Sequence, residues 1–264
     1  AEVLGPKLVD TDKLFRSLRI RERAASYVSE LDQQSPAWQA LQAYLDGINQ
    51  YQATHATPVE FDLLCITPRA FTAEDTISVS GYMAYSFAAA FRTEPLLTYV
   101  RDQLGSDYLK VFDLDWQPKG VLPPTLAAND WKSLGALAQL SDSALSQAGL
   151  PQFEGSNAWV VSGRRTQSGK PLLAGDPHIR FSVPSVWYEA QLSAPDFDLY
   201  GYHQALVPFA FLGNNRAFGW SLTMFQNDDL DLIAEKTNPA NPNQVWYQGQ
   251  WVDMTRTEQE IAVK

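Results

Sequence analysis

The chain has 264 residues, of which 45% are hydrophobic, 19% are charged and eight are tryptophan. This length and composition allow one large or two small domains with a substantial core. A net charge of −10, without a basic cluster, argues against nucleic acid as a partner because nothing would neutralise phosphates. No apolar run is long enough to cross a membrane. The single cysteine, Cys65, excludes a disulfide framework or a cysteine-based metal site, and we expect it to be a small core residue.

Residues 9–56 predict helices. Asp10 or Thr11 is a candidate cap for the first helix, and Ser35 followed by Pro36 is typical of an N-cap with proline in the first turn. From residue 38 onward, apolar residues recur at helical spacing. We therefore expect these helices to cover a core.

A connection and a further helix follow. Two prolines punctuate residues 57–71, which predicts a connection with a short extended piece. A helix is expected after Thr72, with Glu74 and Asp75 in its first turn, where the helix dipole favours acids. Spacing alone indicates that its later residues are ordinary core residues: Met83, Ser86, Phe87 and Phe91.

The amino-acid composition of the chain then changes. Residues 127–150 are rich in Ala, Ser, Leu and Gln at helical spacing, and glycine and proline end that pattern before residue 156. We divide the chain into a helical region (1–140), a linker or spacer (141–155) and a β-rich region (156–264). The β-rich region predicts short strands at 159–162, 171–174, 186–192, 197–200, 209–212, 217–223 and 230–235, and a hairpin around Gly249. Helices followed by antiparallel strands indicate an α+β fold.

Four polar motifs follow one another in the second half of the chain. They are Gly155-Ser156-Asn157-Ala158-Trp159, Asp176-Pro177-His178, Leu212-Gly213-Asn214-Asn215 and Asn227-Asp228-Asp229-Leu230-Asp231. A Gly-Ser turn before a strand is a weak signal alone. In this order and spacing, the motifs resemble the penicillin acylase family of N-terminal-nucleophile hydrolases. The resemblance covers nearly the whole chain and implies part of the family's αββα sandwich.

The resemblance implies that a precursor cuts itself between Gly155 and Ser156, because the family cleaves before a serine in an S-N-x-W context. Ser156 would then be both nucleophile and new N-terminus. A serine hydroxyl needs a base within hydrogen-bond reach. A freed α-amine, with a pKa near ~8, is partly neutral at neutral pH and can serve as that base. An amide nitrogen cannot, so cleavage must come first.

The resemblance assigns two further catalytic roles. His178 follows Asp176-Pro177 just past a strand. A structural histidine is the alternative, but acylases acting on cephalosporins or acyl-homoserine lactones have a histidine here that contacts the nucleophile, whereas penicillin G acylases have glutamine. Met224 matches the residue whose backbone N–H forms part of the oxyanion hole, a donor often worth ~3 kcal/mol. His203 has no such context and is expected to be structural.

The substrate-binding residues also come from the resemblance. Met83 and Phe87 match positions that line the acyl pocket, and Ser86 stands where penicillin G acylases have an arginine that contacts substrate. With Ile179 and Leu212, they predict an apolar pocket for an aromatic or aliphatic acyl group.

The acidic run Asp228-Asp229-Leu230-Asp231 offers hard oxygen ligands that suit Ca²⁺. A solvated acidic edge is the alternative. The family match favours one structural calcium ion held by Asp228, the Leu230 carbonyl and Asp231, with Glu94 completing the set. A lone glutamate such as Glu94 would otherwise be only a solvated side chain.

The resemblance thus implies a penicillin acylase-like amidohydrolase that hydrolyses a linear amide of a small molecule through an acyl-enzyme on Ser156. His178 keeps an acyl-homoserine lactone or cephalosporin acylase open, and a rival is an unprocessed, inactive homologue that serves as a binding module. The family is periplasmic or secreted. Because Ala1–Gly5 resembles a segment inside the family's α chain, and the second oxyanion donor would follow Lys264, we expect an internal piece that needs the rest of the precursor for activity.

Overall fold

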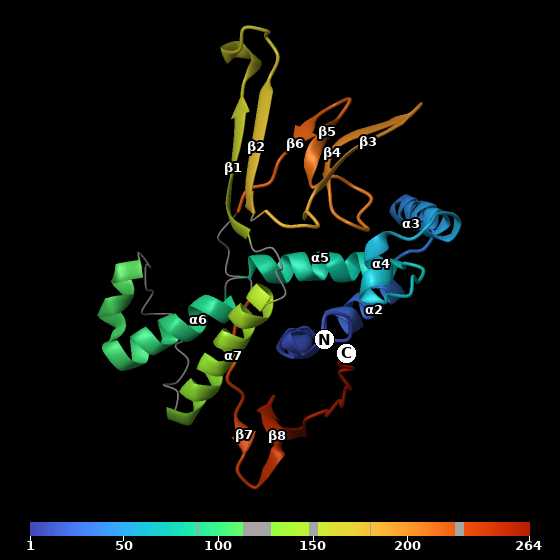
Figure 1. Ribbon diagram of the computed structural model, residues 1–264. Helices are drawn as coiled ribbons and strands as arrows, with labels where there is room; N and C mark the ends of the chain where they lie inside the picture. The colour runs from blue at the N-terminus through green and yellow to red at the C-terminus, as the bar shows by residue number, and fades with distance from the viewer. Residues whose placement is uncertain (89, 113–127, 148–152, 180, 225–229) are drawn as a thin grey trace.

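The computed structural model describes residues 1–88, 90–112, 128–147, 153–179, 181–224 and 230–264. Helices form the first part of the chain and antiparallel strands the second, so the α+β prediction is confirmed at that level (Figure 1). None of the helices among these residues combines the length and the apolar composition that crossing a membrane requires.

Seven α-helices lie within the described ranges, with short turns of other helix types between some of them. The α-helices are α1 (Val9–Leu18), α2 (Ile20–Glu30), α3 (Pro36–Thr54), α4 (Val59–Leu64), α5 (Ala73–Phe87), α6 (Ala90–Tyr99) and α7 (Ala128–Gln147). The 3₁₀ turns are Pro6–Leu8, Ser106–Phe112 and Gly163–Arg165, and Val100–Leu104 is a π-helical turn.

Two predicted helix starts are confirmed. Ser35 is the N-cap of α3, and its hydroxyl accepts the backbone N–H of Trp38 at 3.2 Å. Thr72 and Asp75 form a capping box at the start of α5, in which each side chain satisfies a backbone N–H that the helix leaves free. Such boxes fix where a helix begins because the first four N–H groups have no partner inside the helix.

The first helix starts differently from the prediction. Helix α1 begins at Val9 with Leu8 as N-cap and no side-chain cap, so neither Asp10 nor Thr11 caps it. Thr11 is instead buried, and its hydroxyl donates to the Ala144 carbonyl at 2.9 Å. The threonine therefore joins α1 to α7.

The connection predicted at 57–71 contains the short helix α4, where an extended piece was expected. Cys65 ends α4 in the left-handed conformation (φ 53°) and is exposed, so the prediction of a core cysteine is wrong. Six residues make fewer than two turns, too few to show an apolar period in the sequence.

Helices α1, α5 and α7 enclose the larger core cluster, which contains Leu14, Tyr85, Ala144 and Leu145. The Tyr85 hydroxyl is 2.5 Å from the Ser141 hydroxyl, and both lie in this buried region. Helix α7 continues to Gln147, so the region boundary predicted at residue 140 falls inside a packed helix. Residues 148–152 of the predicted spacer lie outside the described residues.

Within the described ranges, the strands form three antiparallel sheets. The first pairs β1 (Phe153–Val161) with β2 (Leu172–Ile179). The second has the order β3 (Tyr188–Ala194), β4 (Phe197–His203), β5 (Leu212–Asn215) and β6 (Gly219–Trp220), and the third the order β7 (Thr237–Asn238), β8 (Asn241–Tyr247) and β9 (Gln250–Asp253). The turn between β8 and β9 contains Gly249 with φ of 84°, as the predicted hairpin requires. Residues 230–235, predicted as a strand, pair with no strand in the described part of the chain.

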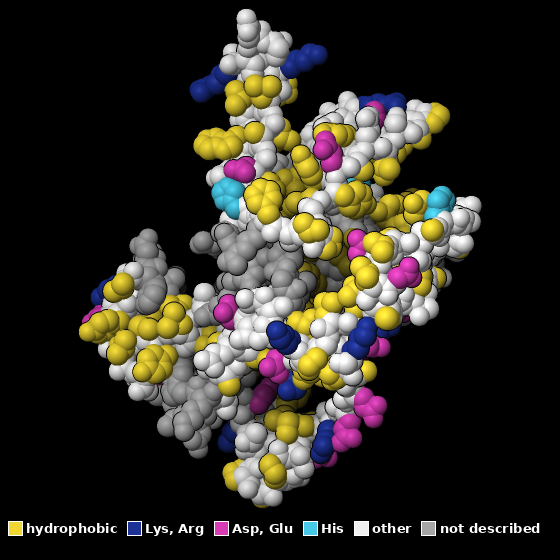
Figure 2. Space-filling model, in the orientation of Figure 1, with side chains coloured by type: hydrophobic (Ala, Val, Ile, Leu, Met, Phe, Trp, Pro, Cys, Tyr) yellow, Lys and Arg dark blue, Asp and Glu magenta, His cyan; other side chains and the backbone are white. Residues whose placement is uncertain are grey.

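The β1–β2 hairpin rises beside the four-stranded sheet, and α5 passes below both (Figure 1). The apolar side chains of the hairpin are well exposed: Trp159 is 67% exposed and Val160 is 75% exposed. Figure 2 shows apolar side chains gathered on the hairpin and on the neighbouring sheet. The proposed nucleophile lies near the lower end of this hairpin.

Candidate active site

Ser156 lies in β1, opposite Pro177 of β2. The backbone N–H of Met224 donates a hydrogen bond to the Ser156 hydroxyl oxygen, with a nitrogen–oxygen distance of 2.9 Å. The two residues are 68 positions apart, so the fold brings the Ser156 motif to a distant segment that the resemblance also singled out. This bond puts the Met224 N–H, the group that the family resemblance assigns to the oxyanion hole, directly beside the candidate nucleophile.

Thr223 makes two further contacts with Ser156. Its hydroxyl donates to the Ser156 carbonyl oxygen at 3.0 Å, and the Ser156 hydroxyl donates to the Thr223 hydroxyl oxygen at 3.3 Å. Sequence reasoning missed Thr223, although it stands next to Met224. A single threonine that belongs to no motif gives no signal of function in the sequence. Only its position next to Met224 could have pointed to the site.

His178 lies on the other face of the hairpin from the Ser156 side chain. Residues directly opposite in an antiparallel pair share a face, and neighbours along a strand alternate. The register pairs Gly155 with His178, Ser156 with Pro177 and Asn157 with Asp176. The structure therefore brings His178 to Gly155, one residue before Ser156, and not to the Ser156 hydroxyl.

Asn157, Asp176 and His178 form an exposed polar cluster on that second face. His178 Nε2 lies 3.0 Å from Asp176 Oδ2 and 3.2 Å from Asn157 Nδ2. The hydrogen bond from His178, followed by that from Asn157, lowers the pKa of the Asp176 carboxyl. A Cβ atom on Gly155 would lie 3.5 Å from His178 Nδ1, so the imidazole ring packs against the residue that precedes the predicted cleavage point.

The predicted pocket residues fall into two groups. On α5, Met83 and Ser86 are buried, the Ser86 hydroxyl donates to the Met83 carbonyl at 2.7 Å, and Phe87 is 42% exposed. Gln204, just after β4, donates from Nε2 to Met83 Sδ at 2.7 Å. The second group lies at the hairpin.

In that second group, Leu212 is buried in β5, and its side chain approaches β2 at Gly175, where a Cβ atom would lie 3.3 Å from Leu212 Cδ2. Ile179, at the end of β2, is half-buried. Leu212 is thus on the hairpin face that carries Ser156, since Gly175 and Pro177 alternate onto one side of β2.

Three of the four predicted calcium ligands lie among the described residues. Glu94 Oε2 accepts the backbone N–H of Leu232 at 2.9 Å, which places this carboxylate against the segment that holds Leu230 and Asp231. Leu230 is half-buried and Asp231 is exposed. Asp228 lies outside the described residues. Within the described ranges, no three His, Cys, Asp or Glu side chains gather closely enough to hold a metal ion.

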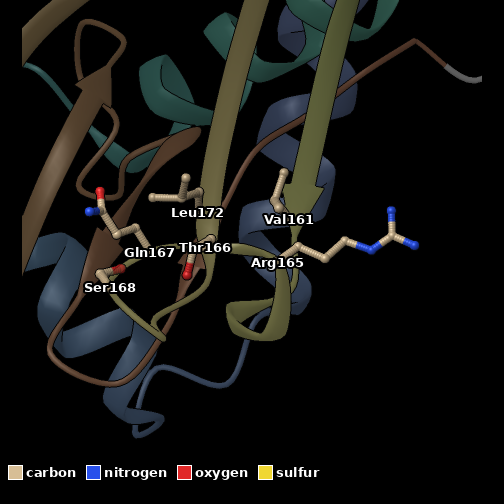
Figure 3. A pocket seen from close by; sticks show the side chains of 6 residues that line it. All are labelled: Val161, Arg165, Thr166, Gln167, Ser168 and Leu172. Carbon is tan, nitrogen blue, oxygen red and sulfur yellow. The ribbon is translucent and has the colours of Figure 1, made fainter.

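A hollow of about 580 Å³ lies at the far end of the hairpin, remote from Ser156. Val161, Arg165, Thr166, Gln167, Ser168 and Leu172 line it. Figure 3 shows Arg165 extending away from Gln167 and Ser168, so these polar groups do not converge on one point. It has neither a nucleophile–base pair nor a set of convergent donors, and we assign it no chemistry.

Comparisons with known proteins agree with the family resemblance. The sequence model described as penicillin amidase matches residues 1–264. An acyl-homoserine lactone acylase of Pseudomonas aeruginosa is 28% identical over 280 residues, which cover 98% of this chain and 31% of that protein. Penicillin G acylase of Escherichia coli is 24% identical over 100% of this chain and 38% of its own length.

Penicillin acylase 2 proenzyme of Pseudomonas sp. strain SE83 is 28% identical over 89% of this chain and 31% of its own length. The chain thus spans about a third of the length of the curated relatives it matches. Because the family model covers every residue, and Ser156 and Met224 meet in the fold, the chain belongs to the penicillin amidase family.

Proposed function

We propose that this chain belongs to an amidohydrolase in which Ser156, exposed as an N-terminus by self-cleavage, attacks a linear amide. The observation that carries this proposal is the hydrogen bond of 2.9 Å from the Met224 N–H to the Ser156 hydroxyl. A backbone donor next to the attacking hydroxyl is also close to the carbonyl under attack, where negative charge develops. The names of the relatives support the same reaction class.

Self-cleavage uses groups that are adjacent in the structure. The Ser156 oxygen attacks the carbonyl carbon of Gly155 and loses its proton, and the bond from that carbon to the Ser156 nitrogen breaks. The nitrogen leaves with a proton as the free amine, which gives an ester of Gly155 on the Ser156 oxygen; water then hydrolyses the ester, releases the Gly155 carboxylate and restores the Ser156 hydroxyl. The Met224 N–H, which meets the Ser156 hydroxyl at 2.9 Å, would stabilise the oxyanion that forms on the Gly155 carbonyl.

In substrate turnover, the freed amine takes the proton from the Ser156 hydroxyl. The hydroxyl oxygen attacks the amide carbonyl, the amine product leaves with a proton, and water releases the acid from the ester. Met224 again donates to the oxyanion. Because His178 packs against Gly155 on the other face of the hairpin, we propose that it orients Ser156 through the neighbouring backbone and not through the Ser156 hydroxyl.

The proposed substrate is a small acyl amide with an apolar acyl group. Relatives are named for penicillin and for acyl-homoserine lactones, and the buried Met83 and Leu212 favour an apolar pocket. We propose a penicillin-type amide as the substrate. An acyl-homoserine lactone or a cephalosporin side chain is the alternative substrate, which His178 favours. An uncleaved homologue that only binds such ligands is the rival from another class.

Four features of the family accompany this proposal. They are completion of the αββα sandwich by the rest of the precursor, removal of a spacer that ends at Gly155, one structural calcium ion, and a periplasmic or secreted location. The exposed Trp159 and Val160 of the two-stranded hairpin support the first, because an isolated hairpin is at best marginally stable in water. Glu94, bonded to the backbone of Leu232, supports the calcium site.

The test uses the full-length precursor, its Ser156→Ala variant and N-terminal sequencing of the purified products. We expect the wild type to yield a polypeptide that begins at Ser156 and to hydrolyse penicillin G or an N-acyl-homoserine lactone, and the variant to remain whole and inactive. An uncleaved wild type that binds these compounds without hydrolysing them would support the binding module instead.

A further inference from the structure

Thr223 contacts both the hydroxyl and the backbone carbonyl of Ser156. A hydroxyl has one proton to donate, and Thr223 gives it to the Ser156 carbonyl oxygen at 3.0 Å. The Thr223 oxygen therefore acts as acceptor for the Ser156 hydroxyl, at 3.3 Å. Met224 N–H meets the same Ser156 oxygen at 2.9 Å. Two consecutive residues thus set the direction of the Ser156 hydroxyl and hold its backbone.

The segment that carries Thr223 is fixed against the hairpin by a regular series of contacts. A Cβ atom built on Gly219 would lie 3.0 Å from Leu173 Cδ2, and one built on Gly175 would lie 2.0 Å from Ser221 Oγ. Every second residue from 219 to 223 therefore faces the Ser156 side of the hairpin. Thr223 follows in this alternation and meets Ser156.

We infer that Thr223 is a positioning residue for Ser156, in self-cleavage and in turnover. This inference rests on the proposed function. Threonine cannot serve as the base, because its proton is committed to a carbonyl and its hydroxyl does not ionise near neutral pH. Its role is to hold the hydroxyl in one rotamer and to fix the backbone of the residue that becomes the N-terminus. Small misplacements of reacting groups cost about 10²-fold in rate, which is the scale of effect expected here.

The experiment compares Thr223→Val and Thr223→Ser in the full-length precursor. Valine keeps the shape and removes both hydrogen bonds, whereas serine keeps the hydroxyl. We expect Thr223→Val to slow self-cleavage and to lower kcat by about 10- to 100-fold, with KM nearly unchanged. The pH dependence of kcat should keep its midpoint, because the base is not altered. Thr223→Ser should stay within a few-fold of wild type.

Thr166→Val is the matched control. The Thr166 hydroxyl lies in the loop of the same hairpin and donates its one proton to the Lys170 carbonyl at 2.7 Å, with the Gly163 carbonyl 3.1 Å away. Its replacement removes this hydroxyl and its hydrogen bond at the far end of the hairpin and should leave kcat at the wild-type value. Probes are penicillin G and an N-acyl-homoserine lactone, and cleavage is followed by intact mass.

The outcomes separate the inference from the proposed function. A wild-type precursor that neither cleaves itself nor hydrolyses either probe defeats the proposed function. A wild type that cleaves and hydrolyses while Thr223→Val matches it defeats the inference alone. Equal losses in Thr223→Val and Thr223→Ser, or a change in KM only, would also overturn it. If Thr223→Val is insoluble, Thr223→Ala is measured against Thr223→Ser under the same criteria.

Discussion

His203, at the end of β4, is 1% exposed and stacks on Tyr188 with ring centroids 5.5 Å apart. Burial lowers the pKa of His203, against a smaller opposing effect of the Val207 backbone. The folded state therefore disfavours the charged ring. The resulting stability is fully present above the ordinary histidine pKa of about 6.5 and is lost as the pH falls below it.

We therefore expect the free energy of unfolding of the full-length protein to fall more steeply from pH 7 to pH 5 than that of His203→Phe. Phenylalanine keeps a ring against Tyr188 and cannot take up a proton. Denaturant unfolding at several pH values measures the difference between the two slopes. Parallel slopes would show that His203 is not the titrating group.

The structure brings together some of the residues that the sequence analysis named and separates others. The motif resemblance placed Met224 at Ser156, and the structure has the two 2.9 Å apart. The same resemblance joined His178 to Ser156, whereas the strand register puts their side chains on opposite faces. A motif gives residue identity and spacing, but the face of a strand depends on register, and register depends on the partner strand.

At the scale of an element, the start of α5 depends on Asp75. Its carboxylate accepts the Thr72 N–H at 2.9 Å and pairs with Arg69 at 2.6 Å, and the side chain is 19% exposed. The hydrogen bond from Arg69 is the largest cause that lowers the pKa of Asp75 to about 2. This stabilisation is fully present above the ordinary pKa of Asp and is lost as the pH falls towards 2.

Asp75→Ala should lower the free energy of unfolding by about 1–2 kcal/mol at pH 7, because it removes both the cap and the ion pair. Glu74→Ala, one residue earlier in the same turn, keeps the capping box and should cost clearly less. Urea denaturation at pH 7 compares them. Equal losses would mean that general first-turn charge, and not the capping box, holds this helix end.

Gly175 controls how closely the segment 219–223 approaches the hairpin. A Cβ atom there would lie 2.0 Å from Ser221 Oγ and 3.0 Å from Ser221 Cβ, so turning the Ser221 hydroxyl away does not relieve the contact and Gly175→Ala is expected to shift the segment that carries Thr223 and Met224. We expect Gly175→Ala to slow self-cleavage of the full-length precursor at least 10-fold, by the same argument of misplaced groups.

Gly47→Ala in α3 is the matched control, because nothing lies within 4 Å of its Cβ position. It should leave cleavage unchanged and stabilise the helix by up to about 1 kcal/mol. Cleavage is followed by intact mass over time. A Gly175→Ala precursor that cleaves at the wild-type rate would mean that the segment tolerates a shift without moving Met224.

Elements with strong local signals were predictable, and elements defined by partners were not. Ser35-Pro36 and Thr72 with Asp75 are complete capping signals in the sequence, and α3 and α5 begin where they indicate. Residues 230–235 have a strand-like composition, yet they pair with no strand in the described part of the chain. Composition shows that a segment can be extended, but only the rest of the molecule decides whether it is paired.

At the scale of the whole molecule, Glu94 joins the helical part to the segment after the acidic motif, through its hydrogen bond of 2.9 Å to the Leu232 N–H. The two residues are 138 positions apart. If calcium binds at Glu94, Asp228, the Leu230 carbonyl and Asp231, the ion fastens the helical region to the β-rich region. Binding to the folded state alone raises stability in proportion to the logarithm of the ion concentration above its Kd.

Removal of calcium from the full-length protein with EGTA should therefore lower Tm by several degrees, and added Ca²⁺ should restore it while Mg²⁺ does not, since Mg²⁺ demands a smaller octahedral site. Glu94→Gln is the informative variant. Its amide oxygen can still accept the Leu232 N–H, but it brings no charge to the ion, so its Tm should respond little to EGTA. An EGTA response equal to that of wild type would place the ion elsewhere and leave Glu94 as a backbone acceptor. Because the measured quantity is Tm, the test of the calcium site does not depend on cleavage before Ser156.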